Sequence, residues 1–435
     1  MADPIPNPTA ANPVWSPWTR IGFRLAFCYL TLYAVCCGNT TFWKTIPLVG
    51  DRLELLFWWP FKHAAPWFGQ HLFHLTGTSA WLHPVGVAGD QALTYVSIGI
   101  MLVVASVATL LWTALDRRST AYPRLYLWLR LLLRVAIGAA MLIYGTMKLF
   151  PNQMAAPSLA VLNEPMGETS PMTLLWTMLG LHPLYEMICG ATELLCGVLI
   201  LFRRTALLGA LLTVFVVGNV ALYNYFFDVP VKIYATHLLL MAFVLIAPDL
   251  RALFGFFWQH TPATARIDWS PWKTSQGLRT ESLLLAAFVA MTLANQSYRL
   301  GPQTLRELHN IAHPGPLTGL WHVDHATQPY ITGDGLPMTV LSLEPNGRAM
   351  LRASDNALWR ATGTCNPADH TLRITPIGRG LVTLYTYTQP DATHLVLTPL
   401  QGQRGVLTLS RIPTPAKYPL LERGFHWVNE WGLER

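Results

Sequence analysis

The length of the apolar runs in this chain limits the folds that it can adopt. These runs recur before Leu300, and each is roughly 18 to 25 residues long, which is enough for a helix to cross the hydrocarbon core of a bilayer. Backbone groups inside lipid need internal hydrogen bonds, so spanning segments of this kind form helices. We therefore expect a polytopic α-helical membrane bundle whose surroundings are a lipid bilayer.

Seven spans are expected, at roughly residues 20–38, 92–114, 126–150, 184–202, 205–227, 230–247 and 279–297. Basic residues gather in alternate loops, for example at Arg117, Arg118, Arg203 and Arg204. By the positive-inside rule these loops and the N-terminus are cytoplasmic, and an odd number of spans puts everything after Leu300 outside. Residues 1–19 are expected to be a disordered cytoplasmic N-terminus.

Shorter helices are expected in the outer loops. The first outer loop, residues 39–91, is rich in Trp, Phe and His, which favour the membrane interface, and one or two helices, lying on the surface or re-entrant, are expected near residues 52–75. A further short helix is expected near residues 171–181.

The composition supports a membrane protein and argues against nucleic-acid binding. The chain is 52% hydrophobic and 12% charged, and its formal charge of +7 follows from basic loops. No RNA- or DNA-binding pattern accompanies that charge. The 6 cysteines include no CxxC pair and no zinc-like spacing, so no metal site is expected.

After about Pro316 the pattern changes to short alternating runs separated by turn signals such as Glu344-Pro345-Asn346-Gly347. The expected strands are Leu320–Val323, Met338–Leu343, Arg348–Arg352, Ala357–Ala361, Thr371–Thr375, Leu381–Thr388, His394–Thr398 and Val406–Arg411. Strands at this spacing predict a small antiparallel β-barrel or sandwich over residues 316–412. An aromatic tail, residues 413–435, is expected to pack on the barrel or on the membrane surface.

Polar side chains interrupt the apolar runs at one depth. Helical rise places Tyr144, Glu193, Asn219 and His237 roughly 9 to 13 Å below the outer boundary, on four consecutive helices. Ionisable groups at such depth usually have a partner or a function. For Tyr144 and Asn219 the simpler interpretation is a hydrogen bond between helices. Glu193 and His237 are the candidate proton-transferring residues.

A shallower polar level is expected nearer the outer boundary. Lys148 and Glu186 lie on facing helices and are expected to form an ion pair, although Lys148 could also snorkel or orient an anionic group. On the inner half of the helix that carries Lys148, Arg130 and Arg134 are expected to snorkel to the cytoplasmic interface.

Two motifs resemble those of the DoxX/DoxD-like membrane family. Ile143-Tyr-Gly-Thr-Met-Lys-Leu-Phe150 ends one helix, and Tyr185-Glu-Met-Ile-Cys-Gly-Ala-Thr-Glu-Leu-Leu-Cys-Gly-Val-Leu-Ile-Leu201 forms the next. The resemblance covers about residues 126–247, with Gly145, Lys148, Glu193 and Gly197 at the matching positions. It implies a four-helix unit and a setting of quinone-coupled sulfur oxidation or thiol and oxidative-stress chemistry. This chain departs from minimal family members by its N-terminal region, its last span and its β domain.

The β domain resembles lipocalin-like barrels. Gly319-Leu320-Trp321 provides a Gly-x-Trp at the first strand, and Arg411 ends the last strand. The resemblance implies that Arg411 stacks over Trp321 and closes the base of the barrel. A barrel of this length is expected to be too small for a roomy ligand cavity.

Together these features predict a bacterial inner-membrane protein with a periplasmic β domain. The leading hypothesis is a redox-linked role in which the bundle binds a quinone or similar apolar carrier near Glu193, Asn219 and His237. In that hypothesis Glu193 and His237 move protons, Lys148, Tyr144, Asn219 and Glu186 line the site, and a partner protein docks through the β domain. The alternatives are a non-enzymatic scaffold or assembly factor and a small-molecule or lipid transporter. The absence of an inverted repeat in the sequence counts against transport.

Overall fold

The computed structural model describes residues 14–37, 42–75, 89–154, 156–262, 269–332, 335–377, 382–400, 405–415 and 417–422. The chain forms two compact units. Unit 1 comprises Met1–Pro84, Ala88–Leu149 and Ile188–Arg299, and unit 2 comprises Val85–Val87, Phe150–Met187 and Leu300–Arg435. The loop segment Phe150–Met187 therefore belongs to the unit that contains the C-terminal strands.

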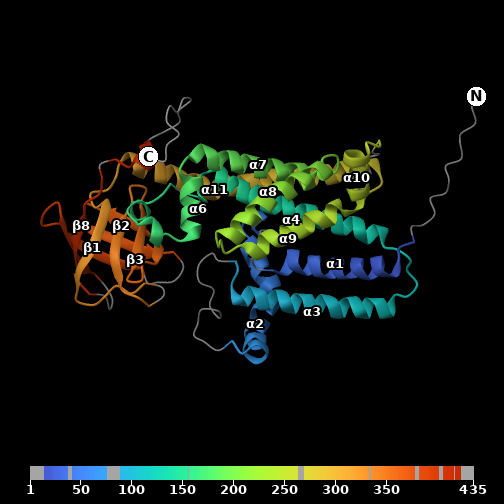
Figure 1. Ribbon diagram of the computed structural model, residues 1–435, viewed down its shortest axis with the longest axis horizontal. Helices are drawn as coiled ribbons and strands as arrows, with labels where there is room; N and C mark the ends of the chain where they lie inside the picture. Colours follow the sequence, from blue (N-terminus) through green and yellow to red (C-terminus); the bar gives the residue numbers. More distant parts are fainter. Residues whose placement is uncertain are drawn as a thin grey trace, which may run out of the picture. The chain divides into compact units, whose positions relative to one another are not determined.

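Unit 1 is a bundle of long helices (Figure 1). Its helices are α1 (Pro17–Cys36), α2 (Gly50–Phe73), α3 (Ala92–Leu115), α4 (Pro123–Leu149), α7 (Pro183–Leu201), α8 (Ala206–Phe226), α9 (Lys232–Ile246), α10 (Leu250–Gln259) and α11 (Ser275–Ala312), with 3-10 turns η1 (Trp43–Thr45) and η3 (Ala247–Asp249). Helices α7 and α11 continue into unit 2. Helix α2 lies in the region, near residues 52–75, where the sequence predicts helical structure.

Six helical stretches in the described part of the chain are long and apolar enough to cross a membrane. They are α3, α4, α7, α8, α11 and the stretch Lys232–Gln259, which joins α9, η3 and α10. The chain is accordingly built as an integral membrane protein. These stretches correspond to six of the seven expected spans.

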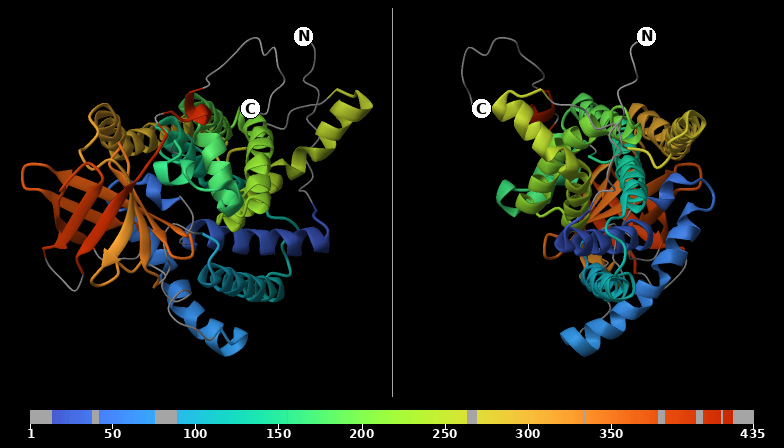
Figure 2. Two further views of the ribbon diagram at one scale, coloured as in Figure 1. Left: turned by 60° about the vertical axis from the view of Figure 1, so that its left-hand side comes forward. Right: turned by 90° about the vertical axis from the view of Figure 1, so that its right-hand side faces the viewer.

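The remaining expected span, residues 20–38, forms helix α1, which is not among those six stretches. Helices α1 and α3 run side by side in opposite directions (Figures 1 and 2). Buried Arg24 of α1 contributes to this pairing, because its Nη1 donates to Thr113 Oγ1 over 2.9 Å and its Nη2 donates to the Asp116 carbonyl over 2.8 Å. Its Nε also donates to the Tyr122 hydroxyl over 3.0 Å. The guanidinium thus links the start of α1 to the end of α3 and to Tyr122.

The prediction that Arg130 and Arg134 snorkel was wrong, because both side chains are buried. Arg134 donates to the Trp269 carbonyl and to Glu281 Oε1 over 2.6 and 3.2 Å, and also to the carbonyls of Ile200 and Leu201. A buried guanidinium with five donors needs such a set of acceptors to offset its desolvation.

Arg130 has a comparable set of partners. Its Cζ lies 3.5 Å from the centroid of the Trp269 ring, and its Nη2 lies 3.5 Å from Asp249 Oδ2. Acidic residues that are far away in the sequence therefore compensate both arginines. The network ties α4 to the ends of α7, α9 and α11.

In unit 2, eight strands form a closed antiparallel barrel, drawn in orange to red in Figures 1 and 2. They are β1 (Gly319–Ala326), β2 (Met338–Leu343), β3 (Arg348–Ala353), β4 (Leu358–Asn366), β5 (Thr371–Pro376), β6 (Thr383–Thr388), β7 (His394–Pro399) and β8 (Leu407–Ile412). Each strand pairs with the next, and β8 pairs with β1. The fold class expected from the sequence, a helical membrane bundle followed by a small β-barrel, is confirmed.

Side chains fill the barrel interior. Its core cluster contains large apolar and aromatic residues, among them Trp321, Leu341, Tyr385, Leu395 and Leu409, each 0% exposed. These residues alternate with outward-facing ones along the strands, as the pleat requires. A barrel of eight strands is just wide enough for side chains to fill.

The predicted contact between the first and last strands is present. Trp321 and Arg411 are register partners, and the Arg411 guanidinium lies 4.9 Å from the centroid of the Trp321 ring. Arg411 Nη2 also donates to the Thr318 carbonyl over 2.9 Å. Gly319, at the start of β1, has a φ of 147°, a conformation that favours glycine.

The rest of unit 2 consists of α5 (Leu159–Leu162), η2 (Met166–Glu168), α6 (Pro171–Gly180), α12 (Pro419–Glu422) and the ends of α7 and α11. Helix α6 covers the short helix expected near residues 171–181. In the described part of the tail, the Tyr418 hydroxyl accepts a hydrogen bond from Asn163 over 2.7 Å. The tail aromatics Phe425, Trp427 and Trp431 lie outside the described residues.

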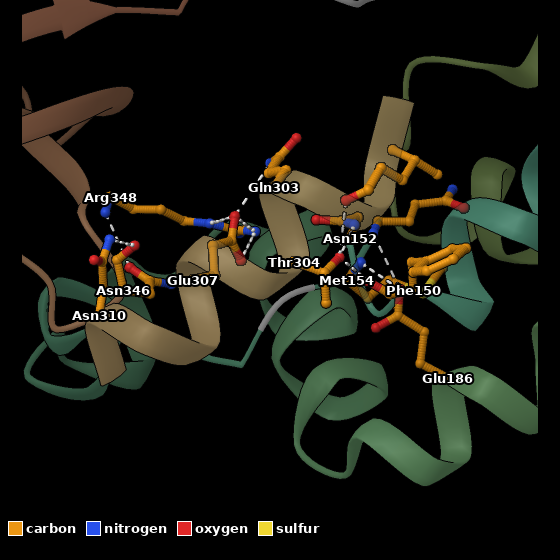
Figure 3. A network of polar contacts seen from close by, with 12 residues as sticks. Phe150, Asn152, Met154, Glu186, Gln303, Thr304, Glu307, Asn310, Asn346 and Arg348 are labelled. Carbon is orange, nitrogen blue, oxygen red and sulfur yellow. Dashed lines mark hydrogen bonds and ion pairs between the residues drawn. The ribbon is translucent and has the colours of Figure 1, made fainter. Parts of the chain in front are cut away.

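Polar contacts join the end of α11 to the barrel within unit 2 (Figure 3). Arg348 of β3 forms a bidentate pair with the Glu307 carboxylate, at 2.9 and 3.0 Å from Nη2. One turn further along, Asn310 donates to the Asn346 carbonyl over 3.2 Å. Positions 307 and 310 lie three apart on one face of the helix, so this face is the one that contacts the barrel.

Candidate functional site

The charged centre of the bundle is an ion pair between Lys148 of α4 and Glu193 of α7. Lys148 Nζ lies 2.9 Å from Glu193 Oε1 and 2.8 Å from Oε2, so it donates to both carboxylate oxygens. The side chains are 6% and 5% exposed. At this burial either charge alone would be strongly unfavourable, and the contact compensates both.

Glycines bring α4 and α7 close enough for this contact. A Cβ at Gly145 would lie 2.8 Å from the Gly190 carbonyl oxygen, and a Cβ at Gly190 would lie 2.8 Å from Lys148 Cβ. Further along the same interface, a Cβ at Gly197 would lie 3.0 Å from Met141 Cβ. Small residues at these positions let the two backbones approach, as in other membrane helix pairs.

Two tyrosines continue the polar cluster from α4 toward α9. The Tyr144 ring lies 5.7 Å from Lys148 Nζ, and its centroid is 6.1 Å from that of Tyr234 on α9. Tyr234 precedes His237 by three residues, so both face the same side of α9. The chain of contacts therefore leads from the ion pair toward His237.

His237 is held by two residues of α1. Its Nε2 lies 2.7 Å from the Tyr29 hydroxyl, and its ring stacks on that of Tyr33 with 3.8 Å between centroids and an interplanar angle of 9°. Tyr29 and Tyr33 are four residues apart, which places both on one face of α1. Helix α1, which is not among the six candidate membrane spans, thus provides a hydrogen-bond partner and a stacking partner for His237.

The hydrogen bonds of His237 define its tautomer. Nδ1 lies 2.8 Å from the Ile233 carbonyl oxygen, which can only accept, so Nδ1 carries the proton and donates. In the neutral ring Nε2 is then the acceptor, and the Tyr29 hydroxyl donates to it. The imidazole is poised to take a proton at Nε2, with Tyr29 as the adjacent donor.

Several predicted site residues come together in unit 1. Tyr144, Lys148 and Glu193 are in direct succession, and His237 follows through Tyr234. Asn219 is not part of this cluster, because its side chain is exposed on α8. Another polar residue of α8, Asn224, is buried, and its side chain donates a hydrogen bond to the Val231 carbonyl over 3.4 Å.

The predicted ion pair between Lys148 and Glu186 was wrong, since Lys148 pairs with Glu193. Glu186 is buried in unit 2, where its Oε1 accepts from the backbone amides of Gln153 and Met154 over 3.1 and 2.9 Å (Figure 3). The same loop is fixed to α11, because Asn152 Nδ2 donates to Thr304 Oγ1 over 2.9 Å. Glu186 therefore anchors the loop that follows α4.

Sequence reasoning missed Tyr29, Tyr33 and Tyr234. Their signal was present in the spacing, because Tyr29 and Tyr33 are four apart in one helix, and Tyr234 is three before His237. Tyrosine is common near membrane boundaries, so spacing alone did not separate these residues from interfacial aromatics.

Comparison with known proteins gives one partial match. A stretch of 87 residues, or 20% of this chain, is 39% identical to "Uncharacterized protein YwoB" of Bacillus subtilis (strain 168). The chain spans 56% of that relative's length. No protein-family model matches the chain, and no solved structure matches it.

Proposed function

We propose that this chain is a DoxX-like bacterial inner-membrane protein with a redox-linked role, and that its bundle binds a quinone among α1, α4 and α9. The observation that carries the proposal is His237, which is hydrogen-bonded to Tyr29 and stacked on Tyr33 inside an apolar helix bundle. A quinone ring is apolar and flat, and its carbonyl oxygens exchange protons when it is reduced. Stacked aromatic rings and a proton-accepting imidazole suit both properties.

The α4–α7 contact supports the proposed resemblance to DoxX-like proteins. The four matching residues all lie there: Lys148 and Glu193 form the ion pair, and Gly145 and Gly197 lie where the helices approach. We assign the ion pair the role of fixing α4 against α7. Tyr144 then links this fixed pair to the aromatic residues around His237.

Reduction of a quinone to a quinol consumes two electrons and two protons. In this proposal a partner protein that carries a redox group supplies the electrons. In this proposal the two protons come from water, and the hydrogen-bonded pair of Tyr29 and His237 exchanges one of them with a quinone oxygen. The barrel is the candidate docking module for the partner, in a periplasmic position that follows from the arginine-rich loops on the opposite side.

A quinone titration of the purified protein tests this proposal. Wild type should bind a short-chain ubiquinone analogue saturably, and His237→Ala should weaken the binding at least about 10-fold. Asn219→Leu is the matched control, because it removes a polar side chain of the bundle outside the cluster, and it should bind as wild type does. Absence of saturable binding by the wild type would contradict the proposal.

A second candidate function, a non-enzymatic scaffold, is favoured by one observation. The barrel interior is filled by buried side chains, so the outer surface is the part of the barrel that can interact. A scaffold should retain its partner when His237 is replaced by Ala at constant expression. A redox protein should retain the partner but lose electron transfer to quinone.

A further inference from the structure

Helix α8 has two opposite faces. Its inner face is built from small residues that belong to the bundle core, namely Ala206, Ala210, Val217 and Ala221. Its outer face consists mainly of larger side chains, which we call the outer seam: Leu208, Leu212, Phe215, Asn219, Leu222 and Phe226. The inner face is used by the fold, so the outer seam is the face of α8 that is left for contacts outside the chain.

The outer seam has the spacing of a helix-packing surface. Its residues follow one another at steps of four, three, four, three and four. Such steps average 3.5 residues and form the stripe along which two helices pack in a left-handed coiled coil. Phe215, Leu222 and Phe226 are 77%, 56% and 78% exposed, Leu208 is also exposed, and Leu212 is half-buried. A regular packing stripe therefore lies on the surface of a candidate membrane span.

Asn219 is the polar residue in this outer seam. Its side chain is exposed, and none of the residues that the structure describes hydrogen-bonds to it. Helical rise puts it about 10 Å from the nearer end of α8, within the length that crosses the membrane. Hydrocarbon offers no hydrogen-bond partner, so an amide at this depth is costly unless another protein surface supplies one.

Other polar side chains on the outer surface of the neighbouring spans have partners within the chain. Thr192 of α7 donates to the Ile188 carbonyl over 2.9 Å. The Tyr225 hydroxyl, on α8 itself, lies 2.9 Å from Thr236 Oγ1 of α9. Asn219 differs from these residues, and we therefore look for its partner outside the chain.

We propose that the chain forms a homodimer in the membrane, in which the α8 helices of two copies pack along the outer seam and the two Asn219 amides hydrogen-bond to each other. Copies that cross the bilayer in the same direction are related by a two-fold axis along the membrane normal, so their α8 helices are parallel. In a parallel pair each seam residue meets its own counterpart. A carboxamide is both donor and acceptor, so a pair of Asn219 side chains is self-complementary.

The position of Asn219 within the repeat also favours a second copy over a different partner. With Phe215 and Leu222 at d positions, Asn219 occupies an a position. A single Asn at an a position is a known device for fixing the register and the number of strands in parallel coiled coils. This inference is independent of the proposed function, because the outer seam lies outside the cluster around His237.

Cysteine cross-linking in native membranes tests the geometry. Phe215→Cys and Leu222→Cys each place a thiol on the outer seam and keep Asn219. Val103→Cys is the matched control, because it places a thiol on an exposed position of α3, a helix that packs against α1 and α2. Oxidation should link both seam variants into a covalent dimer at a yield well above that of wild type and of Val103→Cys.

Replacement of the amide tests its role. The dissociation constant of the dimer in liposomes is measured by fluorescence energy transfer between labelled copies as lipid dilutes them. Asn219→Leu should raise this constant about 3- to 20-fold, the range for one hydrogen bond between membrane helices. Asn219→Gln keeps a carboxamide and should have a smaller effect. Thr192→Val removes an exposed hydroxyl of α7 and should leave the constant unchanged.

Each contrary outcome is distinct. Wild type that stays monomeric at high density in liposomes would overturn the homodimer, and so would cross-linking through Val103→Cys without cross-linking through the seam. Dimerisation through the seam with an unchanged dissociation constant in Asn219→Leu would overturn the amide pair. Energy transfer that appears only with other membrane proteins present would replace the second copy by a different partner.

Discussion

The core of the helix bundle encloses the Lys148–Glu193 ion pair and the hydrogen-bonded His237, whereas the barrel core is filled by apolar and aromatic side chains such as Trp321 and Leu341. Both interiors are buried, but among the described residues the bundle core brings together an ammonium, a carboxylate and an imidazole, whereas the barrel core cluster consists of apolar and aromatic side chains. Polar groups inside a membrane protein are costly to keep. On this basis we place the proposed chemistry in the bundle and the proposed partner contact on the outer surface of the barrel.

The largest effect is expected from a cavity opened in the barrel core. Trp321→Ala should destabilise the barrel by about 3 to 5 kcal/mol, because it removes a fully buried aromatic ring from a filled core. Thermal unfolding of the purified protein, followed by near-ultraviolet circular dichroism, measures the loss. Quinone binding should persist below the unfolding transition, and a loss under about 1 kcal/mol would contradict a tightly filled barrel.

The next effect concerns the buried charges of the bundle, which can be replaced by apolar side chains like those of the barrel core. Lys148→Met leaves Glu193 buried without its partner and should cost about 3 kcal/mol in mixed-micelle unfolding. The double variant Lys148→Met with Glu193→Leu should recover most of that stability, since an apolar pair replaces the charges. Equal destabilisation by the single and double variants would show that the pairing of charges is not what matters.

A smaller effect is expected when a polar contact of the barrel surface is broken. The Arg348–Glu307 pair is partly exposed, at 29% and 20%, so Arg348→Met should cost only about 1 kcal/mol. The effect should shrink as salt is raised, because exposed charges are screened. Stability measured at low and high ionic strength checks this, and a salt-independent loss above about 3 kcal/mol would place this pair with the buried one.

The smallest expected effect concerns pH. Burial raises the pKa of the Glu344 carboxyl above its ordinary 4.5, although Leu159 and Ser342 donate hydrogen bonds to it. Its contribution to stability is then fully present below the unfolded pKa, near 4.5, and is lost as pH rises through the raised folded pKa. The stability of wild type relative to Glu344→Gln should therefore fall with rising pH over that window and then level off.

Unfolding of wild type and Glu344→Gln across a series of pH values measures this difference. Asp391 is a useful contrast, because hydrogen bonds from Thr393 and His394 lower the pKa of its exposed carboxyl. A relative stability that rises with pH would mean that Glu344 behaves like Asp391 and not as a buried acid.

The barrel could be predicted from the sequence in some detail. Alternating runs and turn residues placed all eight strands, and Met338–Leu343 has the same bounds in the structure. Strand periodicity and turn chemistry are local signals, so they survive without knowledge of the tertiary fold. The contact between Trp321 and Arg411 followed from a motif at the two ends of the same barrel.

The site could be predicted only in part. Helical rise gives the depth of Lys148, Glu186 and Glu193, but the depth alone does not say which carboxylate meets the ammonium. That choice depends on the rotation of α7 and on the close approach at Gly145 and Gly190, which are tertiary properties. The estimated depth also placed Asn219 in the polar layer, but its side chain is exposed on α8.

The buried arginines show the same limit in the other half of the bundle. Arg130 and Arg134 lie where arginine commonly snorkels, and their local sequence contains no acid to pair with. Their partners, Asp249 and Glu281, are more than 100 residues away, at |i−j| of 119 and 147. Long-range pairing of this kind has no local signal.

Photoaffinity labelling with an azido-quinone, followed by peptide mapping, tests the contrast between the two interiors most directly. Label is expected in α1 and α9, within the segments that carry Tyr29, Tyr33 and His237, and unmodified quinone should compete with that label. Label confined to the barrel, or spread over α3 and α8 without competition, would contradict the assignment of the chemistry to the bundle.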